Sequence, residues 1–522
     1  MSTTLSVKRT ESQAPDGRSW PIPTSEELEA SGRGLSQQAE QARAAGRRVV
    51  LVQGLGFVGA AVAAVLAAAE DDDGLPRFFV IGLDLPRPDS YWKIARINEG
   101  STPIDSPDPE LGQLTRHAAL EQHNLVATAW QPAYSLADVV IVDVPLDVTD
   151  ASEHDARSIE LRLDPFREAI RAIGRHMRPE ALVVLETTLP IGTTERIVAP
   201  LLREERQQRG IDSPLYLAHA YERVMPGPRY VDSIRRFWRS FAAADTESAD
   251  RARQFLGSFV DTDSHPLTEL ESPAASEMAK LLENSYRAVN IAFIHEWTLL
   301  AEKLGINLFE VIDSIRVRRG THDNIRLPGF GVGGYCLPKD ALLAQWSSIH
   351  LFETGHELGM TLEALSINRD MPLHTFDLVS ELAGGNFKGK TILVCGIAYL
   401  PDVADLRNSP SETLIDALLA AGASPRLHDP CVETWSERPE LPLESDFCAA
   451  IDRADGIVLA VPHRAYLDLD PLVLAGTTGE PPFLVDAQNV LDDTAAERLH
   501  QRGSRVLGVG KGHWRKRGYH LP

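Results

Sequence analysis

The chain has 522 residues, of which 43% are hydrophobic and 24% are charged, and its formal net charge is −22. A globular protein of this length is expected to form two or three domains. The acidic balance argues against a general nucleic-acid-binding protein, which needs a basic surface. Glycine loops and helix N-termini can still bind an anionic ligand whatever the net charge.

The N-terminal region and the cysteines indicate the cellular compartment in which the protein is expected. Residues 1–45 are polar and predict a mobile leader without the apolar core of a signal peptide, although residues 26–45 could form a helix. Cysteines occur without paired or metal-ligand spacing, at Cys336, Cys395, Cys431 and Cys448. This usage predicts a cytoplasmic protein with no disulfide framework and no metal site.

The first strong motif begins at Arg48. A β-branched run over 49–52 precedes a G-x-G-x-x-G segment over 54–59, and an alanine-rich helix follows. A second strand over 78–83 ends in Asp84, where an acid can bind the ribose hydroxyls of NAD. The pattern predicts a Rossmann domain with NAD held at Gly54, Gly56, Phe57, Val58, Gly59 and Asp84.

The same stretch raises the question of a membrane span. Residues 49–69 are uncharged and long enough to cross a bilayer. Three glycines at fixed spacing after a strand-like opening favour a strand, a turn and a buried helix instead. We therefore expect no membrane association.

Further strands are predicted over 139–144 and 182–187, alternating with helical stretches. This rhythm is typical of a doubly wound parallel sheet, whose ligands bind at the carboxyl ends of the strands. Pro145, Thr187 and Thr188 fall at such ends. Each of the three is explained equally well by ordinary turn chemistry.

A long helix is predicted over 274–304, which contains neither proline nor glycine. Lys280, Asn284 and Arg287 lie at i, i+4 and i+7 and therefore share one face. A solvated stripe is the usual explanation of such a face. Because the neighbouring residues are apolar, the helix could instead line a cleft or form a dimer interface.

Residues 328–340 combine glycines with a thiol, an ammonium and a carboxylate in one short loop. Four glycines precede Cys336, and Lys339 and Asp340 follow it closely. Glycines allow sharp turns and close approach to a ligand, and neighbouring charges can shift the pKa of a thiol. The alternative is a tight turn that contains an inert buried cysteine.

A second strand series begins near Lys388 and continues over 457–463 and 483–486. It lacks a complete G-x-G-x-x-G, so a second dinucleotide site is not expected. The predicted fold is α/β, with two Rossmann-like doubly wound domains joined by a long central helical region. The predicted division is a leader over 1–45, an NAD-binding domain over 46–265, a central region over 266–372 and a second α/β domain over 373–522.

Six segments, taken in order, carry a family resemblance. They are Gly54 to Gly59, Glu186 to Thr194, Tyr221 to Gly227, Glu277 to Asn284, Gly331 to Asp340 and Asp405 to Pro410. Together they resemble the UDP-glucose/GDP-mannose dehydrogenase family of nucleotide-sugar 6-dehydrogenases from about Arg48 onward. The resemblance implies an NAD-binding domain, a central dimerising region and a C-terminal domain that binds the nucleotide of the sugar.

The family reaction is a double oxidation of the sugar C6 alcohol to a carboxylate, which consumes two NAD+ and serves polysaccharide biosynthesis. A thiol suits this reaction because it can add to the aldehyde formed first and carry it to a thioester that water hydrolyses. Cys336 is therefore the expected nucleophile. By resemblance, Lys280 would stabilise the oxyanion at C6, and Asp340 with Asn284 would position or activate water.

Further roles follow by resemblance. Thr188 and Glu222 match positions near the reacting centre. Pro145 and Thr188, at the ends of their strands, are also expected to contact the cofactor. The fork of Arg407 suits a phosphate or a sugar. Expected substrate contacts are Glu222, Arg223, Lys280, Asn284, Arg287, Phe330, Gly333 and Arg407.

The sequence departs from the family pattern at three positions that are expected to face the substrate or the cofactor. Leu400 stands where the family commonly has a lysine, Gln488 where an arginine is frequent, and Tyr221 where proline usually precedes the glutamate. Residues 222–227 are similar to members that oxidise UDP-N-acetylhexosamines. Residues 335–340 are closer to the UDP-glucose and GDP-mannose branches. We expect a UDP-N-acetylhexosamine, with UDP-glucose or GDP-mannose as the alternative.

Two other classes of protein share parts of this pattern. A β-hydroxyacid dehydrogenase also joins a Rossmann domain to a long helix that carries lysine and asparagine, but it needs neither the cysteine nor the second α/β domain. A non-catalytic homologue would be signalled by loss of Cys336, Lys280 or Asp340, and all three residues are present.

Overall fold

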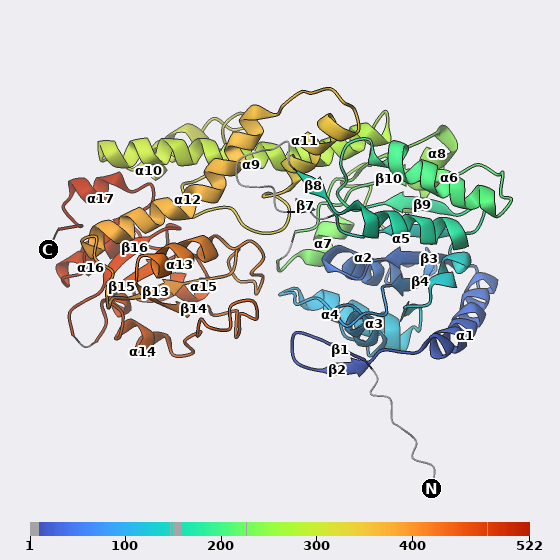
Figure 1. The fold of residues 1–522 in the computed structure, drawn as a ribbon, viewed down its shortest axis with the longest axis horizontal. Helices are drawn as coiled ribbons and strands as arrows, with labels where there is room; N and C mark the ends of the chain where they lie inside the picture. The colour runs from blue at the N-terminus through green and yellow to red at the C-terminus, as the bar shows by residue number, and fades with distance from the viewer. Residues whose placement is uncertain (1–9, 147, 150–158, 226, 478, 522) are drawn as a thin grey trace, which may run out of the picture. The chain divides into compact units, whose positions relative to one another are not determined.

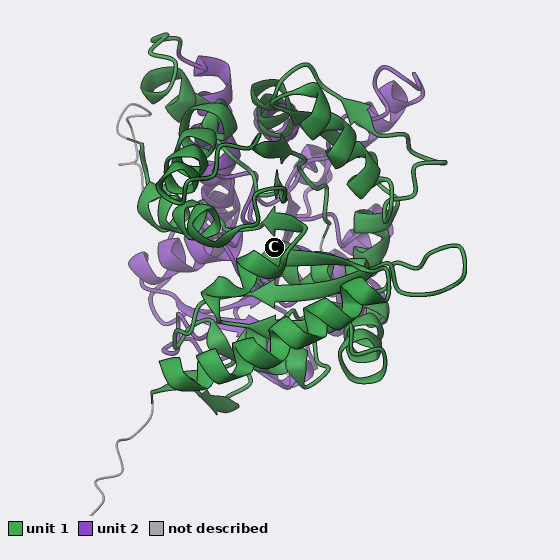
Figure 2. Ribbon diagram, turned by 90° about the vertical axis from the view of Figure 1, so that its right-hand side faces the viewer, with its two compact units in different colours: residues 1–281, 343–356 green, residues 282–342, 357–522 purple. Residues whose placement is uncertain are grey.

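A computed structural model gives the fold of residues 10–146, 148–149, 159–225, 227–477 and 479–521 (Figure 1). The chain forms two compact units (Figure 2). Unit 1 comprises residues 1–281 and 343–356, and unit 2 comprises residues 282–342 and 357–522. The division falls inside the long helix α9, Pro273–Leu304. The domain boundaries expected at 265 and 372 therefore stay a prediction.

Unit 1 is built on a mainly parallel sheet with the strand order β12-β11-β10-β9-β6-β3-β4-β5. Its strands are β3 Arg48–Gln53, β4 Phe78–Leu83, β5 Leu125–Thr128, β6 Val139–Val142, β9 Leu182–Leu185, β10 Tyr216–His219, β11 Ser240–Ala243 and β12 Thr268–Glu269. Strand β11 runs antiparallel to β10. The chain reverses its direction across the sheet between β3 and β6, which pair in parallel, and open α/β sheets bind ligands at such a switch point.

Alternation along the strands builds the core of unit 1. Val50 and Val52 of β3 join a buried cluster with helix α2, Phe57–Ala67, whereas Val49 and Leu51 point to the opposite face. The other helices that contribute to this cluster are α3 Tyr91–Asn98, α4 Pro109–Arg116, α7 Tyr230–Arg235 and α8 Thr246–Leu256. Helices α5, Leu163–His176, and α6, Ala199–Gln208, pack against each other.

The N-terminal residues differ from the expected mobile leader. Strands β1, Glu11–Gln13, and β2, Ser19–Pro21, form a hairpin, and helix α1 follows over Ser25–Ala44. Thr24 and Glu27 cap α1 reciprocally, and Leu35, Ala39 and Ala42 bury its apolar face. The helix expected over 26–45 is therefore present, and residues 10–44 are folded because this stripe has a surface to pack on.

Unit 2 contains a wholly parallel sheet with the order β14-β13-β15-β16-β17. The strands are β13 Thr391–Cys395, β14 Ser424–His428, β15 Gly456–Leu459, β16 Phe483–Asp486 and β17 Val506–Gly508. One face packs against α12 Gly359–Ala383 and α13 Pro410–Ala420. The other packs against α14 Phe447–Ile451, α15 Arg464–Leu467, α16 Asp493–Gln501 and α17 Gly512–Lys516. The two predicted Rossmann-like domains are confirmed.

Helices α9, α10 and α11 lie between the two sheets in the sequence. Helix α10, Leu308–Arg316, packs Leu308 and Ile312 against Ile294 and Ala301 of α9. Helix α11 spans Asp340–His350. The remaining short elements are η1 His117–Glu121, η2 Gln131–Leu136, β7 Val148–Thr149, β8 Glu160–Leu161, η4 Thr194–Val198 and η5 Pro471–Ala475. Among the described residues, no helix is long and apolar enough to cross a membrane.

Candidate functional site

The predicted dinucleotide loop joins β3 to α2 in unit 1. Gly54 adopts a φ of +93°, which favours glycine, and a Cβ there would lie 2.6 Å from the Asp143 carbonyl oxygen. A Cβ on Gly59 would lie 1.9 Å from the Gly54 carbonyl oxygen. A Cβ on Gly56 would meet no protein atom within 4 Å. The first and third glycines therefore hold the turn together, and the second leaves the backbone open to a ligand.

Asp84 lies beside this loop at the end of β4. Its Oδ2 accepts a hydrogen bond from the backbone N–H of Leu55 at 3.0 Å, and its Oδ1 accepts from Leu85 N–H at 2.8 Å. The Lys93 ammonium is 3.7 Å from Oδ2. The carboxylate is thus held rigidly at the tip of the second strand, where a ribose would be recognised.

The other expected cofactor residues lie at the same edge of the sheet. Phe57 and Val58 begin α2, exposed Pro145 follows β6, and half-buried Thr188 follows β9. The ends of parallel strands meet at one edge, and the open backbone at Gly56 together with Asp84 fits a dinucleotide. These residues would hold NAD.

The glycines allow a matched prediction. Gly56→Ala is expected to change the free energy of unfolding by less than about 1 kcal/mol and to weaken NAD binding roughly tenfold or more, because its Cβ meets cofactor rather than protein. Gly59→Ala is expected to lose more than about 3 kcal/mol of stability through its backbone clash. Calorimetric NAD titration and urea unfolding measure both effects. Equal stability of the two variants would contradict this account.

A second set of predicted residues lies farther along unit 1. Lys280 Nζ donates to the Glu222 carbonyl oxygen at 2.9 Å and lies 3.6 Å from Glu222 Oε1. The buried ring of Tyr221 is 5.8 Å from this ammonium and 4.9 Å from the Arg223 guanidinium. Arg223 also donates to the Tyr221 hydroxyl at 2.8 Å. Tyr221 thus lies between two cations, which is possible because an aromatic face attracts positive charge.

Sequence reasoning predicted Glu222 but missed two buried acids beside it, Asp143 and Glu186. Asp143, Glu186 and Glu222 interact electrostatically, and Arg239 donates a hydrogen bond to Glu186. Burial raises the pKa of Asp143 well above its usual range, and the two glutamates raise it further. A protonated Asp143 that donates to Glu186 fits this arrangement. The position of Asp143, directly after the apolar strand β6, was the sequence signal that could have revealed this group.

Glu277 gives a pH-dependent prediction. Its buried carboxylate accepts hydrogen bonds from Gly192 N–H at 2.5 Å and from Thr194 N–H at 2.8 Å, and burial raises its pKa to about 7. Because the folded pKa exceeds the ordinary value of 4.5, the free energy of unfolding should fall as pH rises from about 4.5 to about 7. Glu277→Gln should remove about 3 kcal/mol of that decline, measured by urea unfolding across the range. An unchanged slope would contradict the assignment, and exposed Glu204→Gln is the control.

The cysteine loop gathers a third set of residues in unit 2. Asp340 is completely buried, and its Oδ2 accepts a hydrogen bond from Asn284 Nδ2 at 2.6 Å. Its Oδ1 lies 3.3 Å from Lys339 Nζ, and its backbone N–H donates to the Cys336 carbonyl oxygen at 2.9 Å. Cys336 itself is half-buried. The Cys336 backbone, the Asp340 carboxylate and the Asn284 amide of α9 are therefore neighbours within one unit.

The glycines of this loop serve close packing against residues 399–410. A Cβ on Gly333 would lie 2.6 Å from Tyr399 Cβ and 2.7 Å from the Asn408 carbonyl oxygen. Gly334 adopts a φ of +81°, and its N–H donates to the Arg407 carbonyl oxygen at 2.9 Å. The loop thus docks backbone to backbone on the C-terminal sheet domain.

Arg407 lies beside the same loop. Its guanidinium makes a bidentate pair with Asp405, with Nη2 2.6 Å from Oδ2 and Nε 2.9 Å from Oδ1. Burial works against its charge, but Asp405, Tyr399 and Cys336 favour it, so the pKa of Arg407 is raised. The influence of Cys336 indicates that this fixed cation is close enough to stabilise a thiolate.

Two other predicted substrate residues, Arg287 and Phe330, lie in different surroundings. Half-buried Arg287 lies near Arg326, and burial together with the like charges of Arg287 and Arg316 lowers the pKa of Arg326. Neither Arg316 nor Arg326 belongs to a recognised motif, so sequence reasoning missed this cationic group, which suits a diphosphate. Phe330 is only 1% exposed in the core of unit 2, so its side chain supports the loop by packing.

The structure also locates Leu400 and Gln488, two residues that depart from the family pattern. Leu400 is an exposed apolar side chain in the turn after β13. Gln488 Oε1 would lie 2.9 Å from a Cβ on Gly329, so the amide abuts the start of the cysteine loop. Both residues therefore lie near segments that carry expected substrate contacts, although neither contributes a positive charge.

Comparison with known proteins identified three matching family models in chain order. The NAD binding domain of the UDP-glucose/GDP-mannose dehydrogenase family matches residues 48–237. The central domain of that family matches residues 274–370, and its UDP binding domain matches residues 393–493.

Full-length relatives agree with these matches. UDP-N-acetyl-D-mannosamine dehydrogenase of Pyrococcus horikoshii is 28% identical over 89% of this chain and 99% of its own length. NDP-N-acetyl-D-galactosaminuronic acid dehydrogenase of Ralstonia nicotianae is 30% identical over 81% of this chain and 92% of its own length. A solved structure of UDP-D-ManNAc dehydrogenase from Pyrococcus horikoshii superimposes with a TM-score of 0.75 and 27% identity, covering 89% of this chain and 100% of that one.

Proposed function

Since the chain belongs to the UDP-glucose/GDP-mannose dehydrogenase family and is an NAD-dependent nucleotide-sugar dehydrogenase, we propose that it converts a UDP-N-acetylhexosamine into the corresponding uronate. The observation that carries the proposal is the grouping of Cys336, Asp340 and Asn284. A completely buried acid that is paired with an amide and follows a half-buried cysteine by four residues is poorly explained by packing alone.

The proposed chemistry proceeds in four steps. The C6 alcohol loses a hydride and a proton to give an aldehyde, and the Cys336 thiolate adds to the aldehyde carbon. The resulting thiohemiacetal loses a second hydride and a proton, which leaves a thioester on Cys336. Water then cleaves the thioester, releasing the uronate and the thiol. NAD supplies the hydride acceptor for each oxidation.

Individual residues would take separate parts in this reaction. Lys280, held by the Glu222 carbonyl, supplies a positive charge for the oxygen at C6. Asp340, fixed by Asn284, accepts a proton from the hydrolytic water, and the cation of Arg407 favours the thiolate. Thr188 and Glu222 would lie near the reacting carbon, as the family resemblance implies. Arg223, Arg287 and the backbone of Gly333 would contact the nucleotide sugar.

The acetylhexosamine is favoured by the relatives. Two of them act, by name, on N-acetylated mannosamine and galactosamine derivatives, and their chains align over at least 81% of this one. The segment Glu222 to Gly227 points to the same branch. UDP-glucose is the second candidate because Tyr335 to Asp340 resembles the glucose and mannose branches.

NADH formed per sugar nucleotide consumed tests the proposal. Purified protein is incubated separately with UDP-N-acetylmannosamine, UDP-N-acetylglucosamine, UDP-glucose and GDP-mannose. Two NADH per uronate with one acetylated sugar is the expected result. One NADH per sugar consumed would contradict the thioester route, and turnover of UDP-glucose alone would contradict the proposed substrate.

We also propose that two copies of the chain associate through α9. Exposed apolar residues recur on one face of this helix at Leu282, Tyr286, Phe293, Trp297, Leu300 and Leu304. Their spacing of three, four or seven residues keeps them on one stripe, and such a stripe marks an interaction surface. The cytoplasm is the proposed location because all four cysteines are thiols.

Leu300→Asp tests the dimer. Leu300 is 48% exposed on the stripe, and a buried carboxylate at a dimer interface would cost several kcal/mol, so the variant should elute as a monomer at micromolar concentration. The matched control is Leu419→Asp, which changes a leucine that is 41% exposed on α13. Light scattering during size-exclusion chromatography gives the mass. An unchanged dimer in Leu300→Asp would move the interface elsewhere.

A further inference from the structure

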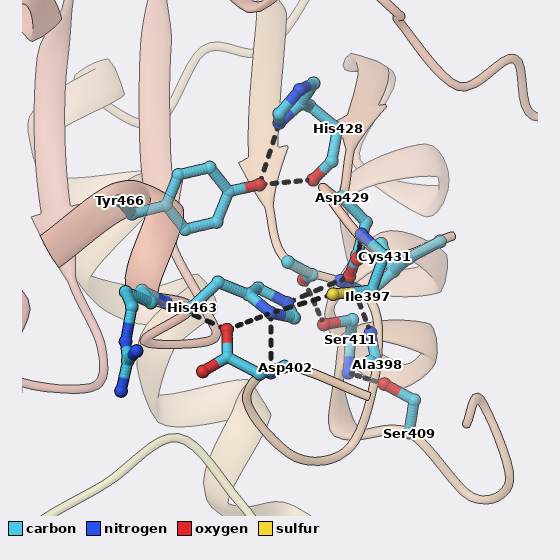
Figure 3. Close-up of polar contacts among 12 residues, drawn as sticks. Ile397, Ala398, Asp402, Ser409, Ser411, His428, Asp429, Cys431, His463 and Tyr466 are labelled. Carbon is cyan, nitrogen blue, oxygen red and sulfur yellow. Dashed lines mark hydrogen bonds and ion pairs between the residues drawn. The ribbon is translucent and has the colours of Figure 1, made fainter. Parts of the chain in front are cut away.

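A group of three different donor side chains, none of which has a part in the proposed reaction, lies at one edge of the C-terminal sheet. Cys431 follows β14, His463 follows β15, and Asp402 lies in the turn after β13 (Figure 3). The Cys431 Sγ, one ring nitrogen of His463 and one carboxylate oxygen of Asp402 all lie within 4.8 Å of one another. A sulfur, a nitrogen and an oxygen thus converge from three separate loops.

Asp429 fixes the orientation of the His463 ring through its Nε2. Its ring is completely buried, and its Nε2 lies 3.1 Å from Asp429 Oδ2. Asp429 is itself fixed, because its Oδ2 also accepts from the N–H groups of Ile397 at 2.8 Å and Ala398 at 3.0 Å. A carboxylate in this position keeps the proton on Nε2 and leaves Nδ1 as the acceptor, near which Cys431 Sγ and Asp402 Oδ1 lie. Histidines that bind metals are held in the same way.

The distances suit a metal ion. His463 Nδ1 lies 3.9 Å from Cys431 Sγ and 3.8 Å from Asp402 Oδ1. Tetrahedral zinc, with bonds of about 2.0–2.3 Å, holds its ligands about 3.3–3.7 Å apart. Once the turn shifts so that the Asp402 N–H leaves Nδ1, a small approach of the three side chains brings them into range. We propose that Asp402, Cys431 and His463 bind a zinc ion, with water as the fourth ligand.

Binding would replace a hydrogen bond that the turn now makes. The Asp402 N–H donates to His463 Nδ1 at 2.9 Å, and Asp402 adopts a φ of +59°, which is uncommon outside glycine. Zinc would take the place of this N–H at Nδ1, and the thiol of Cys431 would lose its proton. The ion would tie the turn between β13 and Arg407 to the ends of β14 and β15. The site lies wholly in unit 2 and does not depend on the proposed substrate.

This proposal revises the expectation that the chain has no metal site. That expectation rested on cysteine spacing, which detects ligands that are close in sequence. Asp402 and His463 are 61 residues apart and meet only because β13 and β15 are neighbours in the sheet. Spacing along the chain carries no signal of such a site.

Zinc titration of the full chain tests the proposal. Protein stripped with a chelator is titrated with Zn2+ against a chromogenic indicator, and with Co2+ to follow the thiolate-to-cobalt absorption band. One equivalent of either metal is expected, with a higher Tm in its presence. Cys431→Ser should lose the band and at least about tenfold in affinity. Asp402→Asn, which changes an exposed side chain, should also weaken binding while the protein stays folded.

Two other cysteine variants serve as controls. Cys448→Ser changes an exposed thiol in the same unit, and Cys336→Ser changes the thiol of the proposed reaction. Both should retain one equivalent of zinc and the cobalt band. Retention of the band in Cys431→Ser, its loss in Cys336→Ser, or the absence of binding by the wild-type protein would each overturn the assignment. A change in the pH dependence of binding in Cys431→Ser would support a thiolate ligand.

Discussion

Cys336→Ala is expected to lower the rate of uronate formation by at least about 10³-fold, because no other nucleophile can replace the thiolate that captures the aldehyde. The substitution removes a half-buried sulfur from a loop whose docking depends on Gly333 and Gly334, so the fold should be retained. Any residual turnover should stop after the first oxidation. The measurement is NADH and uronate formed per sugar nucleotide, with trapping of the aldehyde by a hydroxylamine.

Cys448→Ala is the matched control for that experiment. Its thiol is exposed on the surface of the same unit, so its loss should leave two NADH per uronate. Full uronate production by Cys336→Ala would mean that the glycine-rich stretch is a structural turn. An NADH yield of one per sugar, with trapped aldehyde and no uronate, would place Cys336 after the first hydride transfer.

Lys280→Met is expected to lower kcat by about 10²–10³-fold while changing KM much less. The ammonium is held by the Glu222 carbonyl and Lys280 is only 7% exposed, so its charge acts in a site with little water. A preorganised charge contributes mainly when negative charge develops on the reacting oxygen, which is a transition-state effect. Steady-state kinetics with the best sugar nucleotide give both constants.

The control is Lys303→Met on the same helix, where the side chain is exposed near the end of α9. It should leave both constants unchanged. Lys280→Met could also destabilise unit 1, since the lysine partly neutralises Glu222 beside the buried Asp143 and Glu186. Urea unfolding of the variant separates that effect from the kinetic one. A variant that raised KM and left kcat intact would assign Lys280 to binding alone.

Local patterns were sufficient to predict much of the fold. Strands over 49–52, 78–83 and 483–486 are confirmed within a residue or two, because buried parallel strands are continuous apolar runs. Helix α9 is confirmed because an uninterrupted amphipathic stretch after a proline has few alternatives. The shorter strands β5, β10 and β14 were missed, since four or five residues of mixed polarity carry a weak signal.

The N-terminal region shows a different limit. Residues 10–44 have a polar composition, yet α1 buries a narrow stripe of Leu35, Ala39 and Ala42. Composition averages over the whole segment and hides such a stripe. The capping pair Thr24 and Glu27 was the local sign that a helix begins there.

The sequence by itself determined the family, the dinucleotide loop and the chemistry of single residues, because each depends on residues that are close along the chain. The thiol of Cys336 and the glycine spacing over 54–59 are of this kind. Only the tertiary structure decided which groups meet. The pairing of Asp340 with Asn284, the burial of Asp143 among acids and the meeting of Asp402 with His463 depend on packing between distant segments. Charge interactions and desolvation act through space, so no local pattern of residues specifies them.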